Sequence, residues 1–304
     1  MERRSFLKGL AGGVAALGLS STVGKVLPAL AQEAQFPDLV AVRGESLPAM
    51  FDRALTALGG LERFVKSGQT VLIKPNMGWA VAPELAANTN PELVAHIIKN
   101  ALNLGAKKVY VYDNTCDNWA AAYRDSGLEA ASKEAGATVA PANTSGYYQE
   151  VTVPGAKYLN TIELHELYLE ADSIINVPVL KNHGGAKVTA AMKNLMGAIW
   201  SRGPLHRNGL DETIPELLLY KKPTLNVVDA YRVMLSGGPR GRGDSKYLLS
   251  KMLLASPDAV AVDSASSAIM NGSGVSTPDY IANAAALGLG VADLSTLNIQ
   301  RLNA

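Results

Sequence analysis

The 304-residue sequence contains a single cysteine, Cys116. One cysteine excludes a disulfide within the chain, and it excludes an iron–sulfur cluster or a zinc site held by four cysteines of the chain. The four histidines are scattered and form no close-spaced zinc motif, so no metal site is predicted. The identity of any cofactor therefore stays open, except that a chain-borne iron–sulfur cluster is excluded.

Several common catalytic and nucleotide-binding signatures are also missing. No Gly-x-Ser-x-Gly elbow is present, which argues against a Ser-His-Asp hydrolase. No Gly-x-Gly-x-x-Gly follows the first predicted strand, and the glycine-rich segment 237–243 lacks the Lys-Ser/Thr pair of a Walker A loop. The formal net charge is only +1, so the chain has no overall basic field that would predict nucleic acid as a partner.

Residues 1–31 carry the features of an export signal in the expected order. Residues 2–8, Glu-Arg-Arg-Ser-Phe-Leu-Lys, resemble the twin-arginine motif, a Gly/Ala-rich run covers 9–24, and 29–31 is an A-x-A cleavage site. The run is too short and too glycine-rich for a stable membrane span. We expect the twin-arginine machinery to export the chain to a periplasmic or extracytoplasmic location. Cleavage would remove four basic residues and one acidic residue, which lowers the net charge from +1 to −2.

Short apolar strands alternate with helical segments along residues 32–304. Strands are predicted near 70–74, 109–112, 138–140, 150–153, 173–177, 225–228, 252–255 and 296–302. Helices are predicted near 47–58, 61–66, 91–104, 119–135, 163–170, 188–196, 215–220, 259–270 and 279–287. This alternation predicts an α/β fold with a mostly parallel sheet and helices on both faces. No Gly/Ser linker divides residues 32–304, so we expect a single domain, with a bilobed form left open.

Acidic residues are absent from 173–210, although the stretch is rich in basic ones. An apolar run over 173–177 predicts a buried strand, which Pro178 should end. A loop with the glycine pair 184–185 should follow, and then a helix over 188–196. Cationic side chains and the backbone N–H groups of a helix start would together form an anion site. The alternative is a solvated basic loop.

Polar residues follow four of the predicted strands at their carboxyl ends. In open parallel sheets, ligands bind outside these ends, so the residues should share one basic crevice. The predicted catalytic residues are His183 as the acid/base, Lys181, and Asp113 or Asp229 to orient a base. The predicted substrate-binding residues are Lys74, Asn76, Lys187, Lys193, Asn194, Arg240 and Arg242.

Segments 71–76, 175–183, 188–197, 228–229, 237–241 and 258–263, taken in order, resemble the signature of the DUF362 family over about residues 70–272. The family usually has Lys-Thr-His where this chain has Lys181-Asn182-His183, and Gly-Asn-Gly-Pro where residues 236–239 are Ser-Gly-Gly-Pro. The resemblance implies no particular activity, because the family has none assigned in general. Many members carry added four-cysteine ferredoxin segments. This chain has no such segment, which argues against an electron-transfer role.

Together these patterns predict an exported enzyme that acts on a small phosphate- or carboxylate-bearing substrate. Lys74, Lys181 and Lys193 would hold the anion, and His183 would move a proton. The alternative is a non-catalytic binding or chaperone module for an anionic metabolite or cofactor. A histidine that exchanges protons favours the enzyme, whereas a ligand held only by lysines and backbone amides favours the binding module.

Overall fold

The computed structural model describes residues 36–304, which form one compact unit. The predicted export signal, residues 1–31, lies outside the described residues. Within 36–304, no helix is both long enough and apolar enough to span a bilayer.

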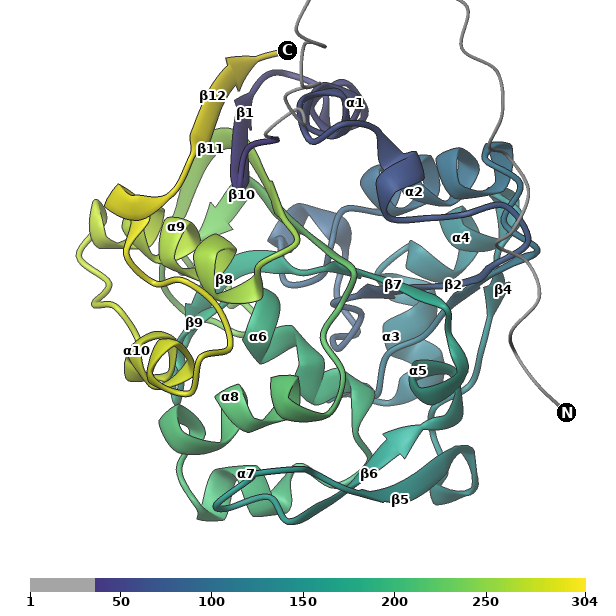
Figure 1. Cartoon of the computed structure of the whole chain (residues 1–304), viewed down its shortest axis with the longest axis vertical. Coiled ribbons are helices and arrows are strands. Elements are labelled where there is room, and N and C mark those ends of the chain that lie inside the picture. Colours follow the sequence, from purple (N-terminus) through teal and green to yellow (C-terminus); the bar gives the residue numbers. More distant parts are fainter. Residues whose placement is uncertain (1–35) are drawn as a thin grey trace, which may run out of the picture. The chain divides into compact units, whose positions relative to one another are not determined.

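A ten-stranded sheet runs through the described part of the chain, in the order β12-β1-β11-β10-β7-β2-β3-β4, with β8 paired to β10 and β9 paired to β8 (Figure 1). The strands β10, β7, β2, β3 and β4 run parallel to one another, whereas β11 is antiparallel to both of its neighbours. The bounds are β1 Leu39–Arg43, β2 Thr70–Pro75, β3 Lys108–Val111, β4 Thr138–Val139, β7 Ser173–Val177, β8 Val179–His183, β9 Lys187–Thr189, β10 Leu225–Met234, β11 Tyr247–Ser256 and β12 Ile299–Asn303. The predicted fold class, α/β with a mostly parallel sheet, is confirmed.

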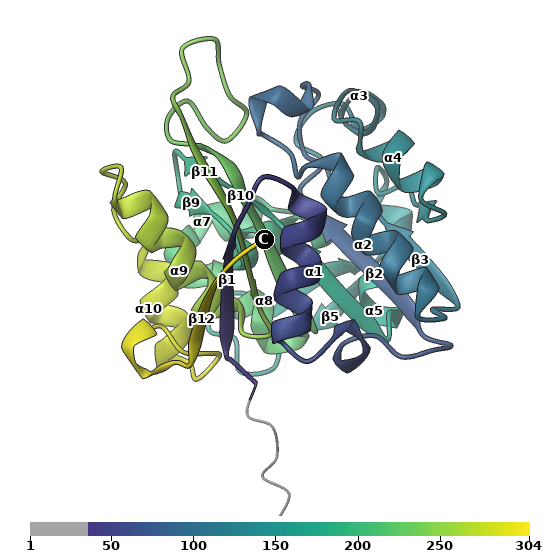
Figure 2. The same ribbon diagram turned by 90° about the horizontal axis from the view of Figure 1, so that it is seen from above.

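Helices cover both faces of this sheet (Figure 2). Their bounds are α1 Leu47–Ala57, α2 Pro91–Asn103, α3 Trp119–Asp125, α4 Leu128–Glu134, α5 Glu166–Glu170, α6 Ala191–Asn194, α7 Gly203–Arg207, α8 Leu210–Tyr220, α9 Ala259–Asn271 and α10 Asp279–Ala286. Helices α1 to α4 share one apolar core, and α6 and α8 to α10 share another. Val71 and Ile73 of β2 enter the first core and Leu72 enters the second, because successive side chains of a strand point to opposite faces.

The predicted starts of the helices near residues 47, 91 and 259 are confirmed, and Ser46, Asn90 and Asp258 cap them. The side chain of each residue accepts a hydrogen bond from a backbone N–H group in the first turn of α1, α2 or α9. Gly59, the second residue after α1, has a φ of 89°, which glycine adopts without strain. These local signals set the ends of α1 and α2, the helices that come before and after β2 in the chain.

The stretch after Pro178 differs from the predicted strand–loop–helix unit. Strand β7 ends at Val177 as expected, but the chain rejoins the sheet as β8 and turns back as β9, with Lys181 paired to Thr189. Proline has no backbone N–H group to donate, but its carbonyl oxygen can still accept a hydrogen bond from a neighbouring strand. The carbonyl of Pro178 still accepts a hydrogen bond from the N–H of Asp229 at 2.9 Å, so the chain continues beside β10. The expected helix over 188–196 is reduced to α6, followed by a 3₁₀ turn over 195–198.

Several other elements differ from the prediction. Residues 161–165 form β6, which pairs with β5 (Tyr148–Thr152) in a small second sheet, so the helix predicted from 163 begins only at 166. Helix α8 starts at Leu210, before its internal Pro215. Strands β10 and β11 each span ten residues and form an antiparallel ribbon, whose connecting loop projects beyond the sheet in Figure 2. Strand β1 was not predicted.

Candidate functional site

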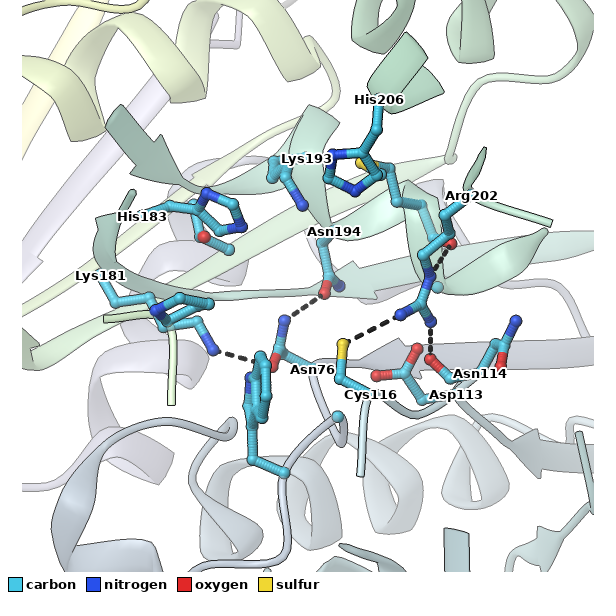
Figure 3. Close-up of a pocket in the computed structure, with 16 residues that line it drawn as sticks. Asn76, Asp113, Asn114, Cys116, Lys181, His183, Lys193, Asn194, Arg202 and His206 are labelled. Carbon is cyan, nitrogen blue, oxygen red and sulfur yellow. Dashed lines mark hydrogen bonds between the residues drawn. The ribbon is translucent and has the colours of Figure 1, made fainter. Parts of the chain in front are cut away.

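A cavity of about 240 Å³ opens at the carboxyl edge of the parallel strands (Figure 3). Segments that follow β2 and β3 line it from one side, and the β8–β9 hairpin, α6 and α7 line it from the others. Of the predicted site residues, Asn76, Asp113, Lys181, His183, Lys193 and Asn194 line this cavity. The sequence analysis assigns no site role to the lining residues Trp79, Cys116, Thr189 and Arg202.

Beneath the cavity lies a buried ion pair. The ammonium Nζ of Lys74, at the end of β2, lies 2.8 Å from Oδ1 of Asp113, and Oδ2 of Asp113 accepts the N–H of Met77 at 2.7 Å. Burial lowers the pKa of Lys74 below its ordinary value, while the Asp113 carboxylate opposes that shift. A β-carbon on Gly197 would lie 1.8 Å from Oδ1, so only glycine fits over this pair. Lys74 does not line the cavity, contrary to its predicted contact with the anion.

Lys181 forms part of the cavity wall and has no carboxylate partner among the described residues. Its side chain is 1% exposed. Its Nζ donates to Oδ1 of Asn76 at 3.1 Å and to the backbone carbonyl of Ala87, and it lies 5.8 Å from the centre of the Trp79 ring. Burial, which penalises the charged form, lowers the pKa of Lys181 to about 7. This amine can therefore gain or lose a proton near neutral pH.

His183 faces the same cavity because residues two apart in a strand share one face. Its ring nitrogen Nδ1 accepts the backbone N–H groups of Gly185 and Ala186, each at 3.0 Å. These two bonds assign the ring hydrogen to Nε2. Burial, together with Lys193 and Lys181, lowers the pKa of His183 to about 3. A neutral ring that offers an N–H group suits hydrogen-bond donation better than the acid/base role predicted for His183.

Two further cationic side chains complete the basic lining. Lys193 forms no hydrogen bond or ion pair through Nζ with any residue that the structure describes, and burial lowers its pKa to about 8. Arg202 donates to the carbonyl oxygens of Met196 and Asn114 and to Sγ of Cys116, the last at 2.9 Å. Among the lining residues, the only carboxylate is the one that already pairs with Lys74. The cavity is therefore a cationic site without an internal counter-ion.

A row of four asparagines leads from Lys181 into the protein interior. Nδ2 of Asn76 donates to Oδ1 of Asn194 at 3.0 Å, Asn194 donates to Asn176 at 2.9 Å, and Asn176 donates to Asn226 at 2.9 Å. Nδ2 of Asn194 and of Asn176 also donates to a backbone carbonyl, which only accepts, so the orientation of these amides is fixed. The row holds Asn76 where it meets the amine of Lys181.

Four predicted site residues lie elsewhere. Asp229 lines a separate hollow and accepts the N–H groups of Asn90 and Tyr231 at 3.0 and 3.1 Å. Because β10 continues for five residues beyond it, Asp229 does not stand at a strand end, and the expectation of one shared crevice is wrong for this residue. The other three are Lys187, which pairs with Asp279, Arg240, which pairs with Asp117, and Arg242, which lies exposed on the β10–β11 loop.

The fold and the cavity define an α/β protein with a basic, ligand-sized hollow outside the carboxyl ends of parallel strands. The family model described as "Domain of unknown function (DUF362)" matches residues 71–268, and the chain belongs to this family. The resemblance seen in the sequence is thereby confirmed.

One relative and two solved structures resemble the chain at low sequence identity. The thylakoid-associated protein sll1697 of Synechocystis sp. is 28% identical over 240 residues, which cover 72% of this chain and 68% of that protein. The lactate racemase apoprotein of Thermoanaerobacterium thermosaccharolyticum is 13% identical, with a TM-score of 0.41, over 70% of this chain and 54% of that one. A Thermotoga maritima protein is 11% identical, with a TM-score of 0.39, over 64% and 52%. This chain thus spans about half the length of both solved structures.

Proposed function

We propose that the cavity binds a small anionic molecule, bearing a carboxylate or phosphate, and that the protein is an enzyme that acts on this molecule. The charge of the lining carries the proposal. Lys193 and Arg202 line one cavity, Lys181 adds a third positive charge when it is protonated, and the only carboxylate in this lining, that of Asp113, is already paired with Lys74. Clustered cations repel one another, and a bound anion would relieve this repulsion through charge-assisted hydrogen bonds.

The size of the cavity restricts the ligand. A volume of about 240 Å³ lies below the range of pockets that hold drug-sized ligands, so the ligand should be a small acid or a single phosphate ester. The Nε2–H of His183 offers an uncharged donor beside the cations and would help to orient the oxygens of such a ligand.

The titration of Lys181 favours an enzyme over the non-catalytic binding module. A buried amine with a pKa of about 7 can accept and release a proton at neutral pH, which a group that only holds an anion does not need to do. We assign the proton-transfer role to Lys181 instead of His183, because the protonated form of His183 would lose two backbone hydrogen bonds.

Thermal melting in the presence of anions tests the proposed site. Phosphate, sulfate or a small carboxylate should raise the melting temperature of the wild type as its concentration rises. The rise should be smaller in Lys193→Ala, because a lost charged hydrogen bond weakens binding by about 1.5–3 kcal/mol. The matched control is Lys157→Ala, which removes an exposed lysine outside the cavity. An equal response in all three proteins would indicate a general salt effect and remove the anion site.

We further propose that the chain is exported by the twin-arginine route. The support is the order of motif, apolar run and cleavage site in residues 1–31. Replacing Arg3 and Arg4 with lysine should leave the uncleaved precursor in the cytoplasm, whereas Lys8→Arg should mature normally. Fractionation and N-terminal sequencing distinguish these outcomes, and normal maturation of the double variant would contradict the proposal.

A further inference from the structure

The hydrogen bonds of Lys181 use only two donors of its Nζ and so accommodate a neutral amine. Its Nζ has two acceptors, Oδ1 of Asn76 and the carbonyl of Ala87. A neutral amine has two N–H groups and one lone pair, whereas an ammonium ion has three N–H groups. The third hydrogen of an ammonium ion would find no acceptor among the described residues. With both of its hydrogens bound to Asn76 and Ala87, a neutral Lys181 keeps its lone pair for another partner.

The surroundings of Lys181 also favour the neutral form. The side chain is buried, and no carboxylate within residues 36–304 pairs with it. Desolvation together with a neighbouring cation, here Lys193, is the arrangement that activates lysines as nucleophiles. The nearby Lys74 differs, because its Nζ is paired with the carboxylate of Asp113, which opposes the lowering of its pKa by burial.

The hydroxyl group of Thr189 is a second, independent indication of a ligand. Thr189 is paired with Lys181 across the β8–β9 hairpin, is 3% exposed and lines the cavity. Its buried Oγ1 has no hydrogen-bond partner in the part of the chain that the structure describes. Buried hydroxyl groups are normally hydrogen-bonded, so an unpaired one that lines a cavity points to an oxygen atom of a bound molecule.

We propose that Lys181 forms an imine with the carbonyl carbon of a small 2-oxo carboxylic acid. This inference rests on the proposed anion site and names its substrate class. Lys193 and Arg202 would hold the carboxylate, and Thr189 would donate to the carbonyl oxygen. A 2-oxo acid carries the anion and the electrophilic carbon on adjacent atoms, which suits a small cavity where the cations and the amine lie on the same lining.

The chemistry balances without a further reactant. The lone pair of Nζ attacks the carbonyl carbon and forms a C–N bond, while the C=O π electrons move to the oxygen. A proton passes from nitrogen to that oxygen and gives a carbinolamine. The C–O bond then breaks, the oxygen leaves with a second proton as water, and the C=N bond forms. One amine and one carbonyl therefore give one imine and one water, with no change of oxidation state.

Reductive trapping with pyruvate tests the inference. The full-length protein is incubated with pyruvate and sodium cyanoborohydride, and the product is analysed by intact mass and peptide mapping. We expect one adduct on Lys181, with a mass increase equal to pyruvic acid less one oxygen atom. Because mapping locates the adduct in the wild type, this result does not depend on how a variant folds.

Variants and a neutral probe sharpen the test. The adduct should be absent in Lys181→Met. In Lys193→Ala its yield at limiting pyruvate should fall at least about tenfold, the change expected from one lost charged hydrogen bond. Propionaldehyde, which has a carbonyl but no carboxylate, should label Lys181 much less than pyruvate does. Adducts spread over exposed lysines at the same yield in Lys181→Met would overturn the inference.

The test also separates this inference from the proposed function. If pyruvate raises the melting temperature of the wild type but not of Lys193→Ala, and no adduct forms at Lys181, the anion site stands and the imine is refuted. If no anion changes the melting temperature and no adduct forms, both proposals fail. Labelling of Lys181 by pyruvate, together with the anion response, supports both.

Discussion

The ion pair of Lys74 and Asp113 beneath the cavity, here called the floor, and the cavity wall each contain a buried lysine, and the two lysines differ in their counter-charge. Lys74 in the floor lies 2.8 Å from the carboxylate of Asp113. Lys181 in the wall contacts only the neutral oxygens of Asn76 and Ala87. Both lysines are essentially inaccessible to solvent, so burial alone does not separate a structural lysine from a functional one. The two lysines differ instead in whether a carboxylate pairs with the amine.

The neighbouring groups reinforce this difference. Gly197 packs directly over the ion pair in the floor and leaves no room for a ligand to reach Lys74. In the wall, Lys181, Thr189 and His183 line open space. We therefore expect changes in the floor to affect mainly the stability of the fold, and changes in the wall to affect mainly ligand binding and its dependence on pH.

Removal of Asp113 should have the largest effect on stability. Asp113→Ala leaves the buried Lys74 without its partner and should lower the free energy of unfolding by about 3–5 kcal/mol, measured by urea denaturation. The double variant Lys74→Met/Asp113→Leu should recover much of this loss, because it leaves no buried charge. If Asp113→Ala were nearly neutral, the two lysines would not differ in the way described.

A single methyl group at Gly197 should have the next largest effect. Its β-carbon would lie 1.8 Å from Oδ1 of Asp113 and 2.7 Å from Nζ of Lys74, so the pair must move apart. Gly197→Ala should cost about 1–3 kcal/mol of stability, as overpacking does in other cores. Gly243→Ala is the matched control, because a β-carbon there meets nothing within 4 Å. Equal stabilities of the two variants would show that the floor tolerates expansion.

The pH dependence of stability should reveal the lowered pKa of Lys181 in the cavity wall. Burial lowers the pKa of Lys181 from 10.5 to about 7, so between these values the unfolded chain binds more protons than the native protein. Stability should therefore rise with pH across this window, by at most about 1.4 kcal/mol per pH unit for one group. Lys181→Met should reduce the slope, and Lys157→Met should not.

The reduction should be partial, because the lowered pKa values of Lys74 and Lys193 act in the same direction. Urea denaturation of each variant at several pH values between 7 and 10 gives the slopes. An unchanged slope in Lys181→Met would mean that Lys181 keeps its ordinary pKa in the folded protein.

Asp229→Asn should have the smallest effect on ligand binding. Asp229 lies in a separate hollow, so its replacement should change anion affinity by no more than about 0.5 kcal/mol, the coupling found between independent sites. Binding titrations of the variant and of Lys193→Ala provide the comparison. A large loss of affinity in Asp229→Asn would place this carboxylate back in the site.

The sequence predicted the parallel strands β2, β3 and β7 well, because each is a short apolar run that is followed at once by turn-forming or polar residues. It therefore also identified Asn76 and Asp113 as neighbours at one edge. It did not predict β8, because a proline after an apolar run normally ends a strand and here only interrupts it. Lys181 and His183 are predicted as site residues because they follow an apolar run and lie in a stretch without acidic residues.

The remaining site residues depend on tertiary contacts that no local pattern reveals. Arg202 follows α6 and reaches the cavity by bonding to carbonyl oxygens, including that of Asn114, far away in the sequence. The pairing of Lys74 with Asp113 likewise joins two strand ends, and only this contact shows that Asp113 is not free to orient a base. Asp229 seemed equivalent to Asp113 because the length of β10 was underestimated.

The row of asparagines beneath the wall has a direction. From Asn76 through Asn194 and Asn176 to Asn226, each amide presents its oxygen towards Lys181 and its NH₂ group away from it. The four amide dipoles therefore add, and the negative end of their sum meets the amine. This field favours the protonated amine and limits how far burial lowers its pKa. The amine of Lys181 is thus connected to Asn226 in β10, at the far end of a row whose members cannot reverse singly.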